Sequence, residues 1–462
     1  MWRILMMLGV LTTIFGCESS SLLIAKEPVP TAKMPRQSMT LVQGVVVVVI
    51  DTLRGDAFGC GESRAMPVLE DLVAQQGTCF TGAYAASSWT KPASASIDTG
   101  VVPTTHQLVT NVAEGVPEKY TQVRADVQML PDYVRGAGGV SAFTTVNWVY
   151  DIPSVSDRYD FDFSPFRSQD PALIDTKTEE KEDENLVINT PVWLEQMGVE
   201  PGDLFLVRYQ FMSPHWPYCP PTVDESQWIV EGVDLCGITD MQEIRNNWEN
   251  PAFAQGLLSL YAEEAAYVGD LVGQLYRTYE EMGFADSTLF IITADHGEEF
   301  YEHGDFGHGS TVFHEQTHVP LAFIGTGIPR GKVVTSPVSA IDIVPTILAS
   351  MERTTTPSDL LEGRNLLPLM RGMTSSPYRW VSQLMGQYGT LQGLCATAPD
   401  GEEWVYINDP IPNEQYLFKP EDVAQENNVS GEESYQTVEA WMASVNNKPM
   451  VAYDQWVEEN YQ

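Results

Sequence analysis

Three short, continuous apolar runs dominate the pattern of hydrophobic and polar positions along the chain. They are Val45–Ile50, Phe205–Met212 and Leu289–Ile292, and only the second contains polar residues, Arg208 and Gln210. Such runs, without alternation of polar positions, are typical of strands that are buried on both faces of a parallel sheet. Stretches with a helical spacing of apolar residues lie between them. The helical candidates are Pro67–Gln76, Leu130–Ala137, Pro191–Met197 and Leu257–Met282.

This alternation predicts an α/β fold, a doubly wound sheet flanked by helices, over residues 44–350. After Met351 the sequence becomes rich in Thr, Pro and Gly, and then shows short apolar runs. These runs, Arg379–Leu384, Tyr388–Cys395 and Glu403–Ile407, predict a smaller C-terminal subdomain with an antiparallel sheet over residues 351–462.

The N-terminus has the pattern of an export signal. Arg3 is followed by a nearly polar-free run, Ile4–Gly16, and Ile14–Cys17 has the form of a bacterial lipobox. We therefore expect a lipoprotein signal peptide over residues 1–17, a tether over residues 18–43, and a mature protein anchored by a lipid at Cys17 in the bacterial cell envelope, facing the periplasm or the cell surface. A plain cleaved signal with an incidental cysteine is the alternative.

Composition narrows the class of partner. The chain has 63 acidic and 25 basic residues, a net charge of −38, and 43% apolar residues in 462. This length and apolar content fit a folded enzyme, and the negative charge disfavours nucleic acid as a partner. A small-molecule, glycan or lipid ester remains open as substrate.

The cysteines suggest disulfides in an exported chain. Their short separations favour pairing Cys60 with Cys79 and Cys219 with Cys236, which leaves Cys395 free, although spacing alone allows other pairings. No Cys-x-x-Cys pair is present, so a thiolate metal cluster is not expected.

The apolar runs lead into residues that carry chemistry. Val45–Ile50 leads into Asp51, the run from Leu289 into Asp295-His296, and the run from Phe205 into His215. Ligands of open α/β sheets bind at the carboxyl ends of the strands, so these side chains are expected to converge there. Thr90 is predicted to be the N-cap of a helix of small residues, where a nucleophile would sit beside an anion-attracting helix terminus.

These motifs, in this order, resemble those of the sulfatase family within the alkaline phosphatase superfamily. The matching blocks are Asp51–Asp56, Met66–Leu69, Phe80–Tyr84, Trp89–Gly100, Ser213–His215, Thr293–Glu299, Gly307–Gly309, Val319–Leu321 and Asp342–Thr346. The resemblance implies an ester hydrolase with one divalent metal held by Asp51, Asp295, His296 and the Thr90 oxygen. Two carboxylates, a hydroxyl and an imidazole leave Ca²⁺, Mg²⁺, Mn²⁺ and Zn²⁺ open; the resemblance implies Ca²⁺, whereas a threonine nucleophile favours Zn²⁺ or Mn²⁺.

Two departures from the family pattern concern the chemistry. The family signature opens with a Cys or Ser that is oxidised to formylglycine, but the β-carbon of Thr90 carries a methyl group and cannot become an aldehyde. We therefore expect no formylglycine. The signature's Ser and basic residue correspond to Ala93 and Ser94, and a later Lys-Trp-His block falls near Val146–Trp148, so several substrate-binding cations are missing.

The resemblance assigns roles around the metal. Thr90 is the expected nucleophile, and His215 and His308 are candidates for protonating the leaving oxygen or binding the anion. Lys91 is a candidate replacement for a missing cation, and Arg54 is expected either to brace the metal turn or to contact the anion. His303 is a candidate ligand of a second metal. The remaining histidines, expected to be structural, are His106, His314 and His318.

The resulting hypothesis is a metal-dependent hydrolase of sulfate, phosphate or phosphonate esters, with phosphorus esters expected to be turned over faster. Two alternatives stay open. One is a transferase of the phosphoethanolamine type, in which an alcohol replaces water. The other is a degenerate, non-catalytic member that binds an anion.

Overall fold

A computed structural model describes residues 42–61, 65–110, 118–150, 152–164, 182–224, 227–351, 360–373, 379–383, 391–398, 401–409 and 414–446. The predicted signal peptide and most of the tether lie outside these residues. The described residues belong to one compact unit that starts at Thr40. The division at residue 350 stays a prediction. Within the described part of the chain, no helix has the length and apolar character needed to cross a membrane.

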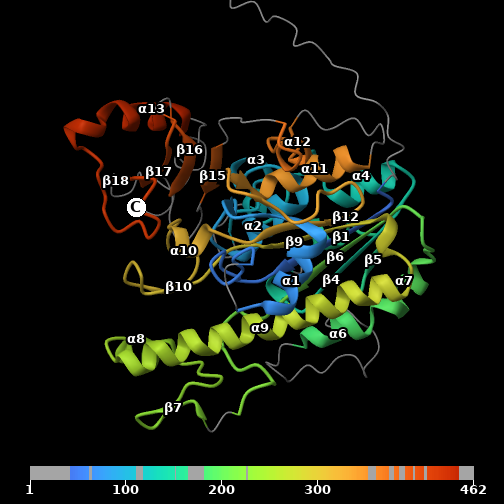
Figure 1. Ribbon diagram of the computed structural model, residues 1–462, viewed down its shortest axis with the longest axis horizontal. Helices are drawn as coiled ribbons and strands as arrows, with labels where there is room; N and C mark the ends of the chain where they lie inside the picture. The colour runs from blue at the N-terminus through green and yellow to red at the C-terminus, as the bar shows by residue number, and fades with distance from the viewer. Residues whose placement is uncertain are drawn as a thin grey trace, which may run out of the picture. The chain divides into compact units, whose positions relative to one another are not determined.

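An eight-stranded mixed sheet forms the centre of the fold (Figure 1), in the order β13-β2-β12-β9-β1-β6-β4-β5. The three runs predicted as parallel strands are parallel neighbours, because β1 pairs with both β6 and β9. β12 is antiparallel to both its neighbours, β9 and β2. The bounds are β1 Gly44–Ile50, β2 Gly77–Phe80, β4 Val140–Thr145, β5 Phe161–Asp162, β6 Phe205–Phe211, β9 Thr288–Ala294, β12 Leu321–Gly325 and β13 Lys332–Val334.

Helices cover both faces of this sheet (Figure 1), which explains why β1 is apolar at every position. Val45, Val47 and Val49 pack in one core with residues of α2, α4, α11 and α12, whereas Val46 and Val48 pack in a second core with α1, α6, α7 and α9. The helix bounds on the first face are α2 Thr90–Thr99, α4 Leu130–Gly136, α11 Ile343–Ser350 and α12 Leu367–Met370. On the second face they are α1 Pro67–Gln76, α6 Asp183–Ile188, α7 Thr190–Met197 and α9 Pro251–Glu281.

The observed helices have bounds close to the predicted ones, except that α9 begins six residues earlier than predicted. α1 has the predicted bounds, and α4 and α7 differ from them by one residue. α9 begins at Pro251 rather than Leu257, because the side chain of Asn250 caps it by accepting a hydrogen bond from the Ala252 amide.

The C-terminal part contains the predicted antiparallel sheet, in the order β15-β16-β17-β18. β16 starts at Gln392, and the first residues of the predicted run Tyr388–Cys395 lie outside the described residues. The bounds here are β15 Arg379–Gln383, β16 Gln392–Thr397, β17 Glu403–Asp409, β18 Glu414–Phe418 and α13 Gln436–Asn446. The other short elements are β3 Ala83–Tyr84, α3 Pro103–His106, α5 Pro153–Ser156, β7 Ile229–Val230, β8 Val233–Asp234, α8 Met241–Asn247, β10 Glu299–Phe300, β11 Phe306–Gly307, α10 His314–Thr317 and β14 Val338–Ser339.

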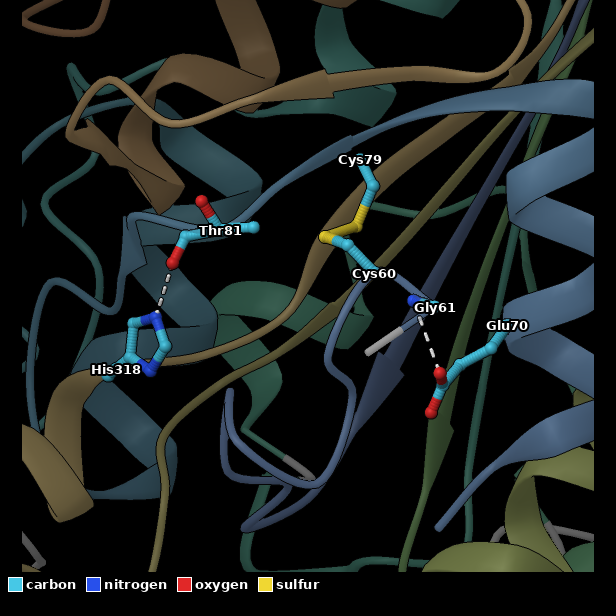
Figure 2. The surroundings of a disulfide bond; sticks show 6 residues. All are labelled: Cys60, Gly61, Glu70, Cys79, Thr81 and His318. Carbon is cyan, nitrogen blue, oxygen red and sulfur yellow. Dashed lines mark hydrogen bonds between the residues drawn. A yellow bond between two sulfur atoms is a disulfide. The ribbon is translucent and has the colours of Figure 1, made fainter. Parts of the chain in front are cut away.

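Both expected disulfides are present. Cys60 pairs with Cys79 and Cys219 pairs with Cys236, while Cys395 is free and buried. Figure 2 shows the first disulfide, which ties the loop after β1 to β2. Beside it the Gly61 amide donates to Glu70 Oε2 at 3.1 Å, and this bond fixes the same loop to α1 (Figure 2).

Candidate metal and catalytic site

Four neighbouring strands each contribute a polar side chain near their carboxyl ends. Asp51 follows β1, Asp295 follows β9, Gln210 lies in β6 and Asn147 follows β4, and these strands are adjacent in the order β9-β1-β6-β4. All four side chains are buried. This is the edge at which the sequence placed the metal site, and the register of the parallel strands brings the two aspartates together.

Asp51, Asp295 and His296 form a compact cluster. Their ligand-type atoms all lie within 4.8 Å of one another. His296 Nε2 is 3.5 Å from Asp51 Oδ1 and 3.8 Å from Asp295 Oδ1. His296 Nδ1 lies 2.9 Å from the Gly297 carbonyl oxygen, and because a carbonyl only accepts, Nδ1 carries the hydrogen and Nε2 presents its lone pair to the carboxylates.

This donor set fits a divalent cation. Asp51 Oδ1 is buried and has no hydrogen-bond partner, although it faces the lone pair of His296 Nε2. Burial, and next the charge of Asp295, raise the pKa of Asp51 well above its usual value, and burial raises the pKa of Asp295 to about 6. Burial lowers the pKa of His296, which keeps the ring neutral. Asp295 Oδ1 accepts a hydrogen bond from the His296 amide at 3.0 Å, but Asp51 Oδ1 and His296 Nε2 are two acceptors 3.5 Å apart, and this contact is costly unless a cation lies between them.

The outer oxygens of both carboxylates are held by amides. Gln210 Nε2 donates to Asp295 Oδ2 at 2.8 Å and lies 3.5 Å from Asp51 Oδ2. Asn147 Nδ2 also donates to Asp51 Oδ2. The Oδ2 atoms therefore face neutral donors, and the Oδ1 atoms are the ones that face His296.

Thr90 lies beside this cluster on α2. Its Oγ1 is 3.3 Å from His296 Nε2. The prediction that Thr90 is the N-cap is wrong: α2 starts at Thr90, and Trp89, with extended backbone, holds the cap position. The Thr90 hydroxyl is consequently not used for capping and is directed toward the candidate ligands. The helix ends at Thr99, and the next residue, Gly100, has the left-handed backbone (φ 73°) common at helix ends.

His308 is held beside the cluster by a buried acid. Its Nδ1 lies 2.7 Å from Glu298 Oε1, and Tyr218 donates to Glu298 Oε2 at 3.0 Å. Burial opposes the charged form of His308, but the charge and hydrogen bond of Glu298 outweigh it and raise the pKa of His308. The His308 ring centroid lies 4.4 Å from that of His296 and 5.1 Å from that of His215. The structure thus brings three of the predicted histidines together.

Arg54 and Lys91 are placed differently from the histidines. The guanidinium of Arg54 donates to both carboxylate oxygens of Asp56, to Glu302 Oε1 and to the Glu298 carbonyl oxygen. Its donors therefore already bond to protein groups around the turn that follows β1. Lys91 is partly buried, and burial lowers its pKa.

His303 does not join a second metal cluster. Its Nδ1 lies 2.8 Å from Glu315 Oε1 and its Nε2 lies 3.0 Å from the Gln425 carbonyl oxygen, so both ring nitrogens are occupied. Among the residues that the structure describes, Asp51, Asp295 and His296 form the one group with metal-site geometry. Two of the histidines expected to be structural bond to the backbone: His106 Nε2 lies 3.1 Å from the Pro92 carbonyl oxygen, and His318 Nε2 lies 2.7 Å from that of Thr81 (Figure 2).

Sequence reasoning assigned no role to several residues of the site. Gln210 and Asn147 hold the carboxylates, and Glu298 holds His308. The signal for Gln210 was its position as a polar residue in an apolar strand. No role was assigned to Gly297 either. A β-carbon there would lie 2.0 Å from the Glu315 carbonyl oxygen, so only glycine allows the turn after β9 to approach α10 this closely.

The described residues form a mixed α/β sheet with an Asp-Asp-His cluster at its carboxyl edge and a hydroxyl at the start of the adjoining helix, the arrangement expected of the sulfatase family. A family model described as Sulfatase matches residues 43–352. The chain belongs to the sulfatase family.

Comparisons with individual proteins agree with this family. A relative from Haloferax volcanii, described as the low-salt glycan biosynthesis sulfotransferase Agl7, is 28% identical over 146 residues, covering 31% of this chain and 32% of the relative. The chain thus spans about a third of that relative's length. The phosphonate monoester hydrolase SpPMH from Silicibacter pomeroyi has a TM-score of 0.65 at 18% identity, covering 87% of this chain and 94% of that one. A 2-O GAG sulfatase, BT1596, has a TM-score of 0.66 at 18% identity, covering 90% and 92%.

Proposed function

We propose that this protein is a metal-dependent hydrolase with Thr90 as nucleophile, and that it turns over phosphate or phosphonate esters faster than sulfate esters. The observation that carries the proposal is the Thr90 hydroxyl, 3.3 Å from His296 Nε2 and beside the Asp51–Asp295 pair. A hydroxyl at a metal cluster is the arrangement needed for nucleophilic displacement.

Asp51, Asp295 and His296, with the Thr90 oxygen, would hold the cation. When bound, a divalent cation supplies Lewis acidity that lowers the pKa of a neighbouring hydroxyl and polarises a non-bridging oxygen of the ester. The family resemblance suggests Ca²⁺, whereas the threonine nucleophile favours Zn²⁺ or Mn²⁺; of these, Zn²⁺ is the one that the imidazole of His296 suits, because Ca²⁺ and Mn²⁺ prefer oxygen ligands.

The side chains around the metal site carry out the nucleophilic attack and the proton transfers. Thr90 Oγ1 gives its proton to solvent and attacks phosphorus or sulfur, and the bond to the leaving oxygen breaks as the new bond forms. His308, whose pKa is raised by the charge and hydrogen bond of Glu298, is placed to give a proton to that oxygen. His215, whose ring lies beside that of His308, is the second candidate. Water then attacks the Thr90 ester and gives a proton to His308, which is neutral after the first step; the bond to Thr90 Oγ1 breaks, and that oxygen regains a proton from solvent as the product leaves.

The preference for phosphorus follows from the chemistry of Thr90. A formylglycine hydrate expels sulfate by breaking its own carbon–oxygen bond, because it carries a second hydroxyl on the same carbon. A Thr90 sulfate ester has no such hydroxyl and must wait for water to attack sulfur. Attack of water on a Thr90 phosphate ester is the easier second step, and a bound cation would assist it by polarising the ester. The engaged guanidinium of Arg54 further favours a singly charged diester or phosphonate monoester over a doubly charged monoester.

The test is a matched panel of aryl esters: sulfate, phosphate monoester, phosphate diester and phosphonate monoester. We expect a phosphorus ester to be the fastest substrate and Thr90→Ala to lower its turnover at least about a thousandfold. Thr99→Ala is the matched control on the same helix, since the Thr99 hydroxyl donates to the Ala95 carbonyl and lies in the last turn. Faster Thr90-dependent release of sulfate would contradict the preference. A panel without turnover would favour the anion-binding alternative.

Group transfer is a second candidate, because one relative is described as a sulfotransferase. The same Thr90 ester gives transfer if an alcohol replaces water. Adding alcohol or sugar acceptors to the assay separates the two functions. Accumulation of a transferred product at the expense of free phosphate or sulfate would identify a transferase.

We also propose that the protein is an envelope lipoprotein anchored at Cys17, supported by the lipobox-like Ile14–Cys17 and the following tether. Glycan esters belong in the substrate search beside small-molecule and lipid esters. The structural neighbour BT4656 is described in complex with its substrate D-glucosamine-2-N,6-O-disulfate.

A further inference from the structure

A row of buried polar contacts runs along the interface between α2 and β6. Thr90, Ser94 and Asp98 are spaced four residues apart and so share one face of α2. Arg208 and Gln210 are spaced two apart and so share one face of β6, where every residue is buried. Four of these residues contact across the interface: Asp98 pairs with Arg208, and Ser94 contacts Gln210.

Arg208 determines which way round the Gln210 amide lies. Arg208 Nη1 donates to Gln210 Oε1 at 2.7 Å. A guanidinium carries only donors, so it must face the amide oxygen. The amide nitrogen is thereby directed to Asp295 Oδ2 at 2.8 Å and toward Asp51 Oδ2 at 3.5 Å. The reversed amide would place two acceptors, Gln210 Oε1 and Asp295 Oδ2, in contact.

Arg208 is itself fixed in place. Its side chain is fully buried, its Nε lies 3.4 Å from Asp98 Oδ1, and its guanidinium lies over the rings of Tyr150 and Phe143 at 5.2 and 5.7 Å. Tyr150 donates to Asp98 Oδ2 at 2.8 Å. The pair is rigid and cannot easily reorient toward solvent.

We propose that Arg208, acting through Gln210, is a positioning residue for the metal site. By fixing the amide it occupies the Oδ2 atoms of both aspartates with a neutral donor and turns the Oδ1 atoms toward His296. The proposal rests on the metal site of the proposed function and is independent of which ester is hydrolysed. Partners in the second layer around a metal typically change its affinity 10- to 100-fold.

The experiment titrates Mn²⁺ into metal-free protein by calorimetry, with Zn²⁺ and Ca²⁺ in parallel. Gln210→Met keeps the volume but removes the amide, and we expect about 10- to 100-fold weaker binding of the cation that the wild type prefers. Asp98→Asn with Arg208→Met removes the buried pair together and avoids leaving Asp98 unpaired, and a similar loss is expected. Arg208→Lys keeps the charge and a donor, so its metal affinity should lie between that of the wild type and that of the Asp98→Asn/Arg208→Met protein.

Non-additivity is the decisive outcome. If Arg208 acts through Gln210, adding Gln210→Met to the Asp98→Asn/Arg208→Met protein should weaken binding no further. Tyr209→Phe is the matched control: it removes buried hydrogen bonds to Thr190 and Tyr279 from the same strand, and it should leave metal affinity unchanged.

Two results would overturn the proposal: wild-type affinity in Gln210→Met, or losses that add. The first is informative even if the Arg208 variants do not fold. Failure of the wild type to bind any of the three cations would overturn the metal site itself and this inference with it.

Discussion

The ion pair of His303 predicts a specific loss of stability at alkaline pH. Both ring nitrogens are bonded, to Glu315 Oε1 and to the Gln425 carbonyl oxygen, and the ring stacks on Phe313 with centroids 4.0 Å apart. Because both partners are acceptors, both nitrogens must donate and the ring is charged. Burial opposes this charge, but the hydrogen bond to Glu315 and its charge outweigh burial and raise the pKa of His303 to about 9.

The size of the effect follows from linkage. An unfolded histidine titrates near its usual pKa of 6.5, so between pH 6.5 and about 9 the folded protein binds more protons at His303 than the unfolded chain does. Stability from this group is therefore fully present below pH 6.5 and is lost as the pH rises through 9. A difference of about 2.5 pKa units corresponds to roughly 3 kcal/mol.

Equilibrium unfolding in urea from pH 6 to pH 10 measures this loss, with His303→Gln as the variant. Other groups titrate over this range, so the relevant quantity is the difference in unfolding free energy between wild type and variant. We expect that difference to fall by about 3 kcal/mol between pH 6.5 and 9.5.

His106→Gln is the matched control for this experiment. Burial lowers the pKa of His106 to about 3, so its ring is neutral over the whole range. Because the unfolded histidine titrates near pH 6.5, the corresponding difference for His106→Gln should rise by less than about 1 kcal/mol up to pH 7.5 and stay constant above it. A difference for His303→Gln that does not fall between pH 7.5 and 9.5 would refute the charged ring and its pairing with Glu315.

Two further predictions concern the metal and the membrane. Asp295→Asn keeps the shape of the side chain but removes its charge, so it should lower metal content and turnover together; elemental analysis showing full metal occupancy would contradict the ligand assignment. Cys17→Ala, expressed with the signal in a bacterium, should leave the membrane fraction or stay unprocessed, whereas a fully soluble wild-type protein would contradict lipid anchoring.

The strands and the metal cluster could be predicted because their signals are local. A strand buried on both faces must be apolar at every position, and Val45–Ile50 meets that condition directly before Asp51. The same rule located β9 before Asp295 and His296. Pairing of Cys60 with Cys79 followed from short separation, which the structure satisfies by bringing the loop after β1 against β2.

Contacts between distant segments carried no such signal. Asn147 reaches Asp51 across 96 positions of sequence, and nothing in its immediate neighbours distinguishes it from a turn residue. His303 resembled a metal ligand because it follows Asp295 and His296 closely in the sequence. Its imidazole Nε2 instead contacts the carbonyl oxygen of Gln425, which lies 122 positions further along the chain, and the sequence could not indicate that contact.

The interface between α2 and β6 lies between these two cases. Arg208 and Gln210 were visible as polar residues in an apolar strand, and Thr90, Ser94 and Asp98 have a helical spacing of four. Each pattern alone has an ordinary explanation. A buried arginine, however, requires an acid partner and an acceptor, and a helix of small residues that carries an aspartate in its buried face requires a cation. Packing of α2 on β6 meets both requirements, because Asp98 and Arg208 pair there. The polar residues that interrupt an otherwise apolar strand are therefore the ones that connect α2, the helix of the proposed nucleophile, to the carboxylates of the candidate metal site.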